Sequence, residues 1–242
     1  MHDEKKTTGD SNIAFISSND SGKDFSNRKF HRANDLLSFS PQIAATEKGN
    51  VHVVWVDKNN ATGDSNVIFR SSNDNGKDFD QSVRLNRNPY QTSTSTPQIA
   101  ATEKGNVYVV WVDENNATGD SNVIFRSSND NGMDFDHSVR LNRNPNQTST
   151  SSSPQIAATE KGSVYVVWSE NNLQFKEILD NGSIFGRTIS LNNNIVLALS
   201  PQIVAIENGN VYLVWAEKNS GTNNDTVLLF KRISQSFFDR NL

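Results

Sequence analysis

The sequence predicts an all-β fold built from a repeated unit of four short strands. The tripeptide Pro-Gln-Ile recurs four times along the 242 residues, beginning at Pro41, Pro97, Pro154 and Pro201. All four Trp residues keep the same spacing, and each ends an apolar run such as Val-Tyr-Val-Val-Trp. No segment shows a sustained helical period. Self-similarity with separations of 56, 57 and 47 residues indicates an architecture assembled from small repeated sheets.

Each strand of the unit can be placed from the first complete repeat. We expect strands over 42–46, 50–56, 66–71 and 82–85, because the runs are bounded by turn residues and the longest of them is rich in β-branched side chains. The second strand is apolar at consecutive positions, which is typical of a strand covered on both faces by neighbouring sheets. Four short antiparallel strands in a unit of roughly 40 to 57 residues predict a β-propeller blade.

The whole chain is expected to form one propeller of four to five blades. Residues 40–95 and 96–151 differ at only six of 56 positions, so they are two copies of one blade. The partial units at the ends are predicted to hold two and three strands, which gives 17 strands in all. We expect these terminal units to meet, or to associate with another copy, because an unpaired sheet edge invites pairing. The expected units are 1–39, 40–95, 96–152, 153–199 and 200–242.

The composition excludes several classes of partner. The chain has no Cys and so holds no disulfide, and its 21% charged residues, 13 Gly and 6 Pro fit neither collagen nor charge-driven disorder. A formal net charge of -4 without long Lys or Arg runs argues against nucleic acid. No stretch approaches a run of about 18 apolar residues, so no membrane insertion is expected.

A second motif lies between the third and fourth strands of the unit. Its pattern is Ser-x-Asp-x-Gly-x-x-Phe, which occurs three times intact and once in a worn form with Ile178 in place of Ser. Asp and Ser can bond the backbone of their own turn, Gly permits positive φ, and Phe can pack into the sheet below. We therefore interpret the motif as a structural staple. Its residues are Ser18, Asp20, Gly22, Phe25, Ser72, Asp74, Gly76, Phe79, Ser128, Asp130, Gly132, Phe135, Asp180, Gly182 and Phe185.

This motif resembles the Asp box, or bacterial neuraminidase repeat, of sialidases and of many related propellers that are not sialidases. The resemblance covers essentially the whole chain through its repeats, and it implies a sialidase-like β-propeller. Sialidase activity would further imply three clustered Arg, a Tyr nucleophile activated by a Glu, and an Asp acid/base. Arg70 and Arg126 belong to the repeat itself, so we expect them to be surface residues of the blade.

No catalytic residue is assigned from the sequence. Tyr108, Tyr165 and Tyr212 share one strand position with His52, so packing explains them better than nucleophilicity. Nearly identical blades also supply identical groups, whereas an active site needs unlike ones. Our preferred hypothesis is a non-enzymatic binding or structural module, with a glycan or a surface protein as its partner. The alternative is a sialidase-type glycoside hydrolase, an exo-α-sialidase, or a fragment of one.

The loop after the second strand is a candidate site for weakly bound calcium, and no other cofactor is expected. It offers hard oxygen ligands on a turn, although no copy has the Asp-x-Asx-x-Asx-Gly spacing, so a solvated loop is the other interpretation. Such acidic loops would also give one face a negative potential that repels the carboxylate of sialic acid. The candidate calcium ligands are Asp57, Asp64, Asp113 and Asp120.

Sequons in polar loops favour an extracellular or cell-surface location. A glycan could project from such loops, and a leader would then lie upstream of this segment. The candidate glycosylation sites are Asn60, Asn116, Asn146 and Asn224.

Overall fold

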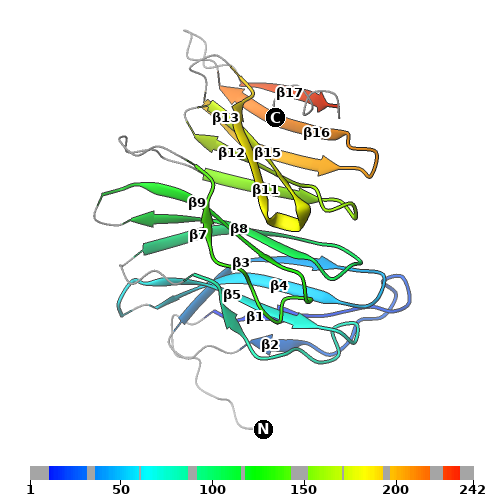
Figure 1. Cartoon of the computed structure of the whole chain (residues 1–242). Coiled ribbons are helices and arrows are strands. Elements are labelled where there is room, and N and C mark those ends of the chain that lie inside the picture. The colour runs from blue at the N-terminus through cyan, green and yellow to red at the C-terminus, as the bar shows by residue number, and fades with distance from the viewer. Residues whose placement is uncertain are drawn as a thin grey trace.

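The fold is all-β, as predicted. The computed structural model describes residues 11–31, 36–59, 61–86, 92–115, 118–142, 152–170, 172–192, 197–218 and 226–234. These residues form 17 β-strands and one 3₁₀ helix, η1 (Asp180–Gly182), which is the only helix among them. The strands make five antiparallel sheets, which we name sheets I to V in chain order (Figure 1).

The sheets follow the predicted units, with two strands in the first, four in each of the next three and three in the last. Sheet I is β1 (Ile13–Phe15) and β2 (Lys29–His31). Sheet II is β3 (Leu36–Ala45), β4 (Val51–Asn59), β5 (Ser65–Ser72) and β6 (Val83–Arg84). Sheet III is β7 (Thr92–Ala101), β8 (Val107–Asn115), β9 (Ser121–Ser128) and β10 (Val139–Arg140). Sheet IV is β11 (Ser152–Ala158), β12 (Val164–Glu170), β13 (Asn172–Leu179) and β14 (Ile184–Ser190), and sheet V is β15 (Leu197–Ala205), β16 (Val211–Lys218) and β17 (Thr226–Ile233).

The first strand of each of sheets II to V begins earlier than the sequence predicted. β3 starts at Leu36 instead of Gln42, and β7, β11 and β15 also start before their Pro-Gln-Ile segment. The ladder to β4 shifts register between Phe39 and Gln42, and Ser40 there has a φ of 52°. This β-bulge takes the Ser-Pro pair out of the ladder, so the strand continues across a Pro that would otherwise mark its end.

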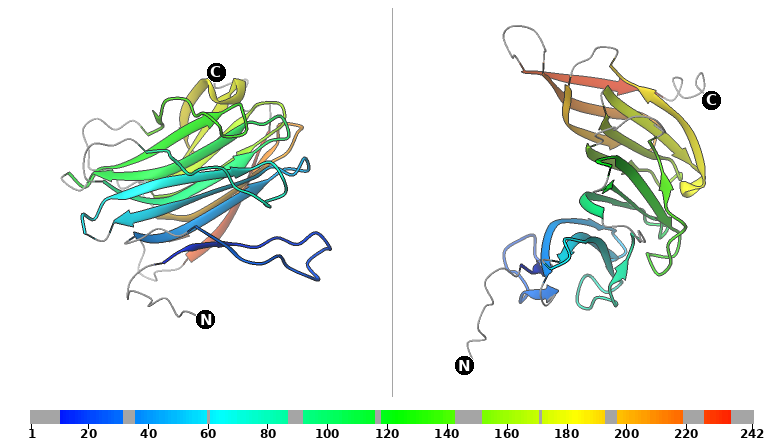
Figure 2. Two further views of the ribbon diagram at one scale, coloured as in Figure 1. Left: turned by 90° about the horizontal axis from the view of Figure 1, so that it is seen from below. Right: turned by 90° about the vertical axis from the view of Figure 1, so that its left-hand side faces the viewer.

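Successive sheets stack face to face along an arc (Figures 1 and 2). We call the face that a sheet turns toward the next sheet in the chain its forward face, and the opposite face its backward face. The forward side chains of sheet II, such as Val67 and Phe69, share one core cluster with the backward side chains Val109 and Trp111 of sheet III. Burial on both faces explains why the second strand of each blade is apolar at consecutive positions.

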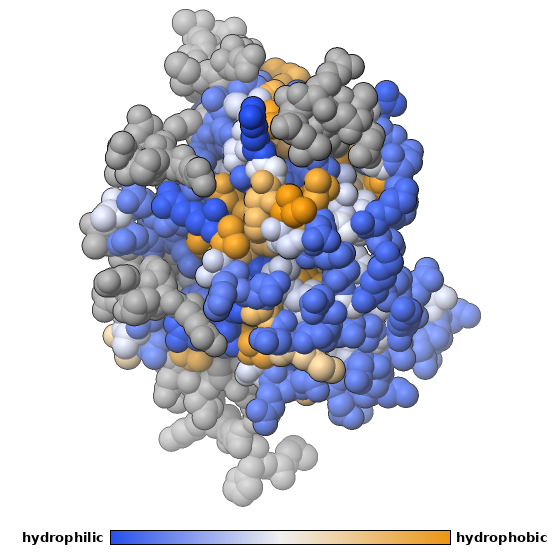
Figure 3. All heavy atoms as spheres, viewed as in Figure 1, coloured by the Kyte–Doolittle hydropathy of each residue, from blue (hydrophilic) through white to orange (hydrophobic). Residues whose placement is uncertain are grey.

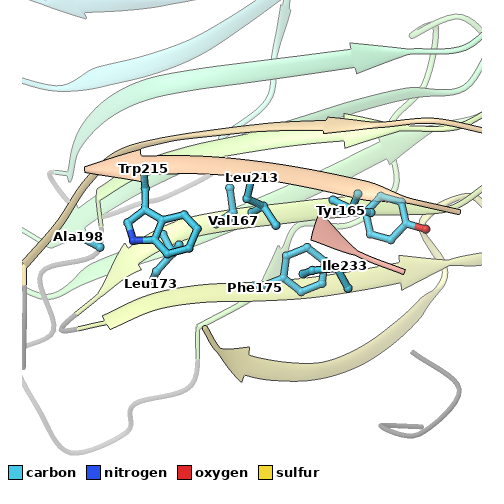
Figure 4. Close-up of a cluster of buried hydrophobic side chains, with 9 residues drawn as sticks. Tyr165, Val167, Leu173, Phe175, Ala198, Leu213, Trp215 and Ile233 are labelled. Atoms are coloured by element: carbon cyan, nitrogen blue, oxygen red, sulfur yellow. The ribbon is translucent and has the colours of Figure 1, made fainter. Parts of the chain in front are cut away.

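The same packing recurs between the last two sheets. Figure 4 shows Tyr165 and Phe175 on the forward face of sheet IV beside Leu213 and Trp215 from sheet V. Each sheet therefore stabilises its neighbour through a dry apolar layer, and fully burying one such side chain contributes roughly 1.5 to 3 kcal/mol.

The two ends of the arc do not meet within the chain. Sheet I lies at one end and β16 and β17 lie at the other (Figures 1 and 2). The expectation that the terminal units meet in one chain is therefore wrong. The physical reason is that five stacked sheets of this twist do not turn far enough to bring the first against the last.

The surface seen in the view of Figure 1 is mostly hydrophilic, with apolar side chains showing between the polar ones (Figure 3). In the parts of the chain that the structure describes, no helix is long and apolar enough to cross a membrane.

One buried position on the second strand distinguishes the two nearly identical blades. In every blade its ring stacks on the Phe of the third strand, and the centroids of His52 and Phe69 are 5.9 Å apart. His52 is only 1% exposed, and neither ring nitrogen has a hydrogen-bond partner among the described residues. Burial lowers the pKa of His52 to about 4. The position is held by His52, Tyr108, Tyr165 and Tyr212.

We expect His52 to make the protein less stable in mild acid. Unfolded His titrates near pH 6.5 and folded His52 near 4, so the unfolded state binds more protons between these values. The free energy of unfolding should fall as the pH drops through this window, by about 3.5 kcal/mol in total at 1.4 kcal/mol per pKa unit. His52→Tyr, which restores the residue of the neighbouring blade, should flatten this part of the profile.

Urea unfolding at pH 7, 5.5 and 4 measures the effect. His137→Gln is the matched control, because it also installs the residue of the other copy but at an exposed position. Equal pH slopes for His52→Tyr and the parent protein would contradict the prediction.

Candidate functional site

A row of acidic side chains marks one end of the sheets. Each acid stands two residues after the Trp of a second strand, where β4, β8, β12 and β16 approach the loop to the third strand. The row is formed by Asp57, Asp113, Glu170 and Glu217. Because each Trp belongs to a backward face, the acids lie along the seams between successive sheets.

Three of the four acids accept a hydrogen bond from the indole of their own Trp. Trp55 Nε1 donates to Asp57 Oδ1 at 2.7 Å, and the Ser38 hydroxyl donates to the same oxygen at 2.6 Å. The corresponding indole bonds to Glu170 and Glu217 measure 3.1 and 2.9 Å. These bonds hold the carboxylates in fixed positions at the seams.

Asp113 is the acid of the row whose charged form is disfavoured by burial. Burial raises the pKa of its carboxyl, and the Thr94 hydroxyl, which donates to Asp113 Oδ1 at 3.0 Å, and the Trp111 indole offset only part of that rise. The buried Asn122 Oδ1 of the neighbouring strand has no hydrogen-bond partner among the described residues. The seam between sheets II and III therefore holds an acid with a raised pKa beside a free acceptor.

Sequence reasoning found only half of this row. Asp57 and Asp113 entered as calcium candidates, whereas Glu170 and Glu217 were missed. The signal was present as a Trp-x-acid pattern repeated in all four blades.

The calcium candidates are not drawn into one cluster. The backbone oxygen of Asp64 accepts from the Asn59 amide at 2.8 Å, and Asp120 Oδ2 accepts from the Thr118 hydroxyl at 2.9 Å. Within the described ranges, no three His, Cys, Asp or Glu side chains are grouped as metal ligands. Calcium binding therefore stays a prediction.

The repeated Tyr residues are packed as expected from the sequence. Burial raises the pKa of Tyr165 to about 12 and also raises the pKa of Tyr108. Neither pKa is lowered toward the range of a nucleophilic phenolate, and the Glu177 carboxylate beside Tyr165 adds to the rise there.

Arg70 and Arg126 secure the turns of their blades. Arg126 donates from Nε to the Asp136 carbonyl and from a terminal nitrogen to the Phe135 carbonyl, both at 2.6 Å. In sheet IV the matching side chain is Lys176, which donates to the Gly186 carbonyl at 3.0 Å. The basic residue of each blade thus binds backbone carbonyls of its own turn.

A hollow of about 350 Å³ lies beside Arg126. Its walls include Leu85 of sheet II and Asp134, Asp136 and His137 from the turn of sheet III. His137 replaces the Gln81 of the other copy, so this hollow carries one of the few side chains that distinguish the two blades.

The Ser-x-Asp-x-Gly-x-x-Phe turns are cross-braced by their own side chains. The Ser72 hydroxyl donates to Asp74 Oδ1 at 2.7 Å and accepts from the Gly76 amide at 3.0 Å. The amide of Asp78 donates to Asp74 Oδ1 at 2.9 Å, and these bonds lower the pKa of Asp74. The turns that begin at Ser18 and Ser128 repeat the arrangement.

The fourth turn, which has Ile178 in place of Ser, is held by a different set of hydrogen bonds. Ser183, which follows the Asp instead of preceding it, donates to Asp180 Oδ2 at 2.7 Å. The turn closes as η1, with Asp180 and Asn181 both at positive φ.

The Gly and the Phe of these turns hold the preceding sheet. A Cβ at Gly76 would lie 2.6 Å from the ring of Phe15, and Phe79 meets that ring edge-on with centroids 4.9 Å apart. The turn of sheet III holds Phe69 in the same way. In sheet IV, Phe185 meets Phe125 edge-on, and a Cβ at Gly182 would lie closest to Ser127, with Phe125 at 3.5 Å. We call this arrangement, in which a third-strand Phe is held by the Gly and Phe of the next sheet's turn, the aromatic clamp.

The comparisons with known proteins bear on the fold. No protein-family model and no curated protein matches this sequence. Among solved structures, an α-L-arabinofuranosidase of Fusarium graminearum matches with a TM-score of 0.60 and 12% identity, over 85% of this chain and 66% of that one. An α-L-arabinanase of Penicillium chrysogenum matches with a TM-score of 0.53 and 16% identity, over 91% and 85%. An intramolecular trans-sialidase of Ruminococcus gnavus matches with a TM-score of 0.57 and 14% identity, over 93% and 51%.

The chain is similar in fold to propeller glycosidases. It spans just under two thirds of the arabinofuranosidase and about half of the trans-sialidase. The structural part of the predicted resemblance is therefore confirmed as a sialidase-like propeller fold. The preference for a non-enzymatic module gains no support, because these structures bear the names of enzymes that act on glycans.

We expect Asp74→Ala and Asp130→Ala to reduce stability without affecting any activity or binding. Each change removes the acceptor of a hydroxyl and of a backbone amide in the turn, and such donors are costly to leave unsatisfied. Thermal melts should show a lower melting temperature for both variants. Asp78→Ala is the control, because its side chain is 95% exposed and makes only a surface ion pair with Lys29 at 3.7 Å. Unchanged melts combined with lost ligand binding would show that these turns are functional and not structural.

Proposed function

We propose that this chain forms blades of a glycan-acting propeller of the glycoside hydrolase kind, with its chemistry at the acidic row. The observation that carries the proposal is the seam between sheets II and III, where Asp113 has a raised pKa. A glycoside hydrolase requires one carboxyl group that is protonated when it meets the substrate. The fold similarity to glycosidases supports the same reaction class without deciding it.

Asp113 and Glu170 are the pair that we assign to the reaction. Sheets packed face to face lie about 10 Å apart, and inverting glycosidases hold their two carboxyl groups roughly 6.5 to 9.5 Å apart. A sheet spacing of about 10 Å is closer to the separation of an inverting pair than to the roughly 5 to 5.5 Å of a retaining pair. Glu170 is also less buried than Asp113, which suits a carboxylate that meets water.

The proposed chemistry is a single displacement. The carboxyl group of Asp113 donates its proton to the glycosidic oxygen as the bond to the sugar breaks. Glu170 takes a proton from a water molecule whose oxygen bonds to the anomeric carbon. The products are the free sugar and the shortened alcohol, and Asp113 recovers its proton from Glu170 through solvent.

The charge of the row favours a neutral substrate. Four carboxylates along one end of the arc repel an anionic sugar such as sialic acid. We therefore propose an arabinofuranoside or another neutral glycoside in preference to a sialoside. An extracellular or cell-surface location fits such a substrate, and the sequons offered for it at Asn60, Asn116, Asn146 and Asn224 lie outside the described residues.

Hydrolysis of fluorogenic α-L-arabinofuranosides and sialosides tests the proposal. We expect the neutral substrate to be cleaved, and Asp113→Asn to lower the rate by about 10²- to 10⁴-fold, the range of general acid catalysis. Asp57→Asn is the matched control, because it makes the same change at the same position of a nearly identical blade. Since the acid must be protonated, the rate should fall as the pH rises through the raised pKa of Asp113.

Two results would overturn the assignment. Full activity in a folded Asp113→Asn variant would remove Asp113 from the chemistry. A folded parent protein that cleaves no neutral glycoside or sialoside would reject the hydrolase itself.

The second candidate function is glycan binding without cleavage. It is favoured by the hollow beside Arg126, which has the size of a small sugar and polar walls. Calorimetry with arabino-oligosaccharides separates the two, because binding that is lost in His137→Ala but kept in Asp113→Asn would place the sugar in this hollow.

A further inference from the structure

Sheet V turns an apolar face toward no other described part of the chain. Leu228 and Phe230 are 75% and 68% exposed, whereas Val67 and Phe69, at the same positions of sheet II, are fully buried. The ring of Tyr212 already stacks on Phe230, as the corresponding rings do in the other blades. Sheet V thus presents the forward face of its three strands, with the third-strand Phe of an aromatic clamp in place and nothing described that holds it.

Sheet I presents the other half of a clamp. A Cβ at Gly22 would meet nothing within 4 Å, and Phe25 is 60% exposed. In sheets II and III the equivalent Gly lies against a third-strand Phe of the preceding sheet, and in sheet IV it lies against Ser127 and Phe125 of sheet III. Ile16, on the backward face of sheet I, is 47% exposed as well. The turn at Gly22 and Phe25 therefore has the residues of a clamp but no described Phe ring between them.

We propose that sheet V of one copy docks on sheet I of a second copy, with Phe230 held by the second copy's Gly22 and Phe25. The contact continues the interface that already joins the sheets of one chain, because it pairs a forward face with the turn of the next sheet. Both halves of this clamp cannot come from one copy, since sheets I and V lie at opposite ends of the arc (Figures 1 and 2).

This docking is head to tail and uses two different surfaces. Such a contact leaves one free end of each kind in a dimer, so further copies can add until a ring closes or a filament grows. Covering the exposed aromatic rings favours association. The described part of sheet I has only two strands, so we expect the contact to be small, weak and concentration-dependent.

The lack of Cys in the chain allows a direct test. Phe25→Cys and Phe230→Cys are made in separate copies, mixed, and treated with a short bismaleimide. The rings of the existing clamps are 4.9 to 5.9 Å apart, so the paired thiols should be within reach. We expect a cross-linked dimer in the mixture and none from either variant alone. Met133→Cys, 72% exposed on another turn, replaces Phe25→Cys in the control mixture and should not cross-link.

Three outcomes would overturn the proposal. No dimer in the mixture, at concentrations up to the solubility limit, would mean that the two surfaces do not meet. A dimer from Phe230→Cys alone would indicate face-to-face pairing of two sheets V. An internally cross-linked monomer from a chain carrying both substitutions would show that the ring closes within one copy.

A charge on the docking face provides an independent measurement. Phe230→Asp should abolish concentration-dependent association in sedimentation velocity. Its melting temperature at low concentration should match the parent protein, because the side chain is exposed in the single copy. Association that persists in this variant would place the contact elsewhere.

Discussion

The aromatic clamp is the interaction on which the rest of the fold depends. Sheets that stack along an arc need a contact that fixes both their spacing and their rotation, and the clamp supplies it with one ring and one turn. Gly76 shows how strict the fit is, because its φ is 77° and a Cβ would collide with Phe15. The Asp and Ser of the turn then hold that Gly in place. A motif that looks local in the sequence therefore connects one sheet to the next.

The seams between sheets have two different ends. The clamps close one end with aromatic rings, and the acids two residues after each Trp lie at the other end. The Asn86 side chain illustrates how the polar end is joined, since it donates to the Ser65 carbonyl of its own sheet and to the Thr94 hydroxyl of the next. Each seam is therefore packed dry at one end and holds a hydrogen-bonded carboxylate at the other.

Much of this architecture could be predicted from the sequence, because the same strand and turn pattern occurs in several copies. The number of strands and their grouping followed from the spacing of Pro41 and its counterparts. The early start of the first strands did not, because a β-bulge lets the strand cross a Ser-Pro pair that reads as a terminator. Closure of the arc also could not be judged, because it depends on the angle between sheets, and no single residue encodes that angle. The Trp-x-acid row was visible but became meaningful only when the seams were seen.

Near-identical repeats place a clear limit on where chemistry can arise. Among the differences between residues 40–95 and 96–151 that fall on described residues, His52/Tyr108 is the one with fully buried side chains. It is tolerated because either ring stacks on the same Phe. The core therefore keeps the two blades alike, and unlike groups must come from a third blade. Glu170 is such a group, since it replaces Asp at one position of the row and extends the carboxylate by one methylene. A pair of unlike acids on neighbouring sheets is the smallest departure from symmetry that could separate an acid from a base.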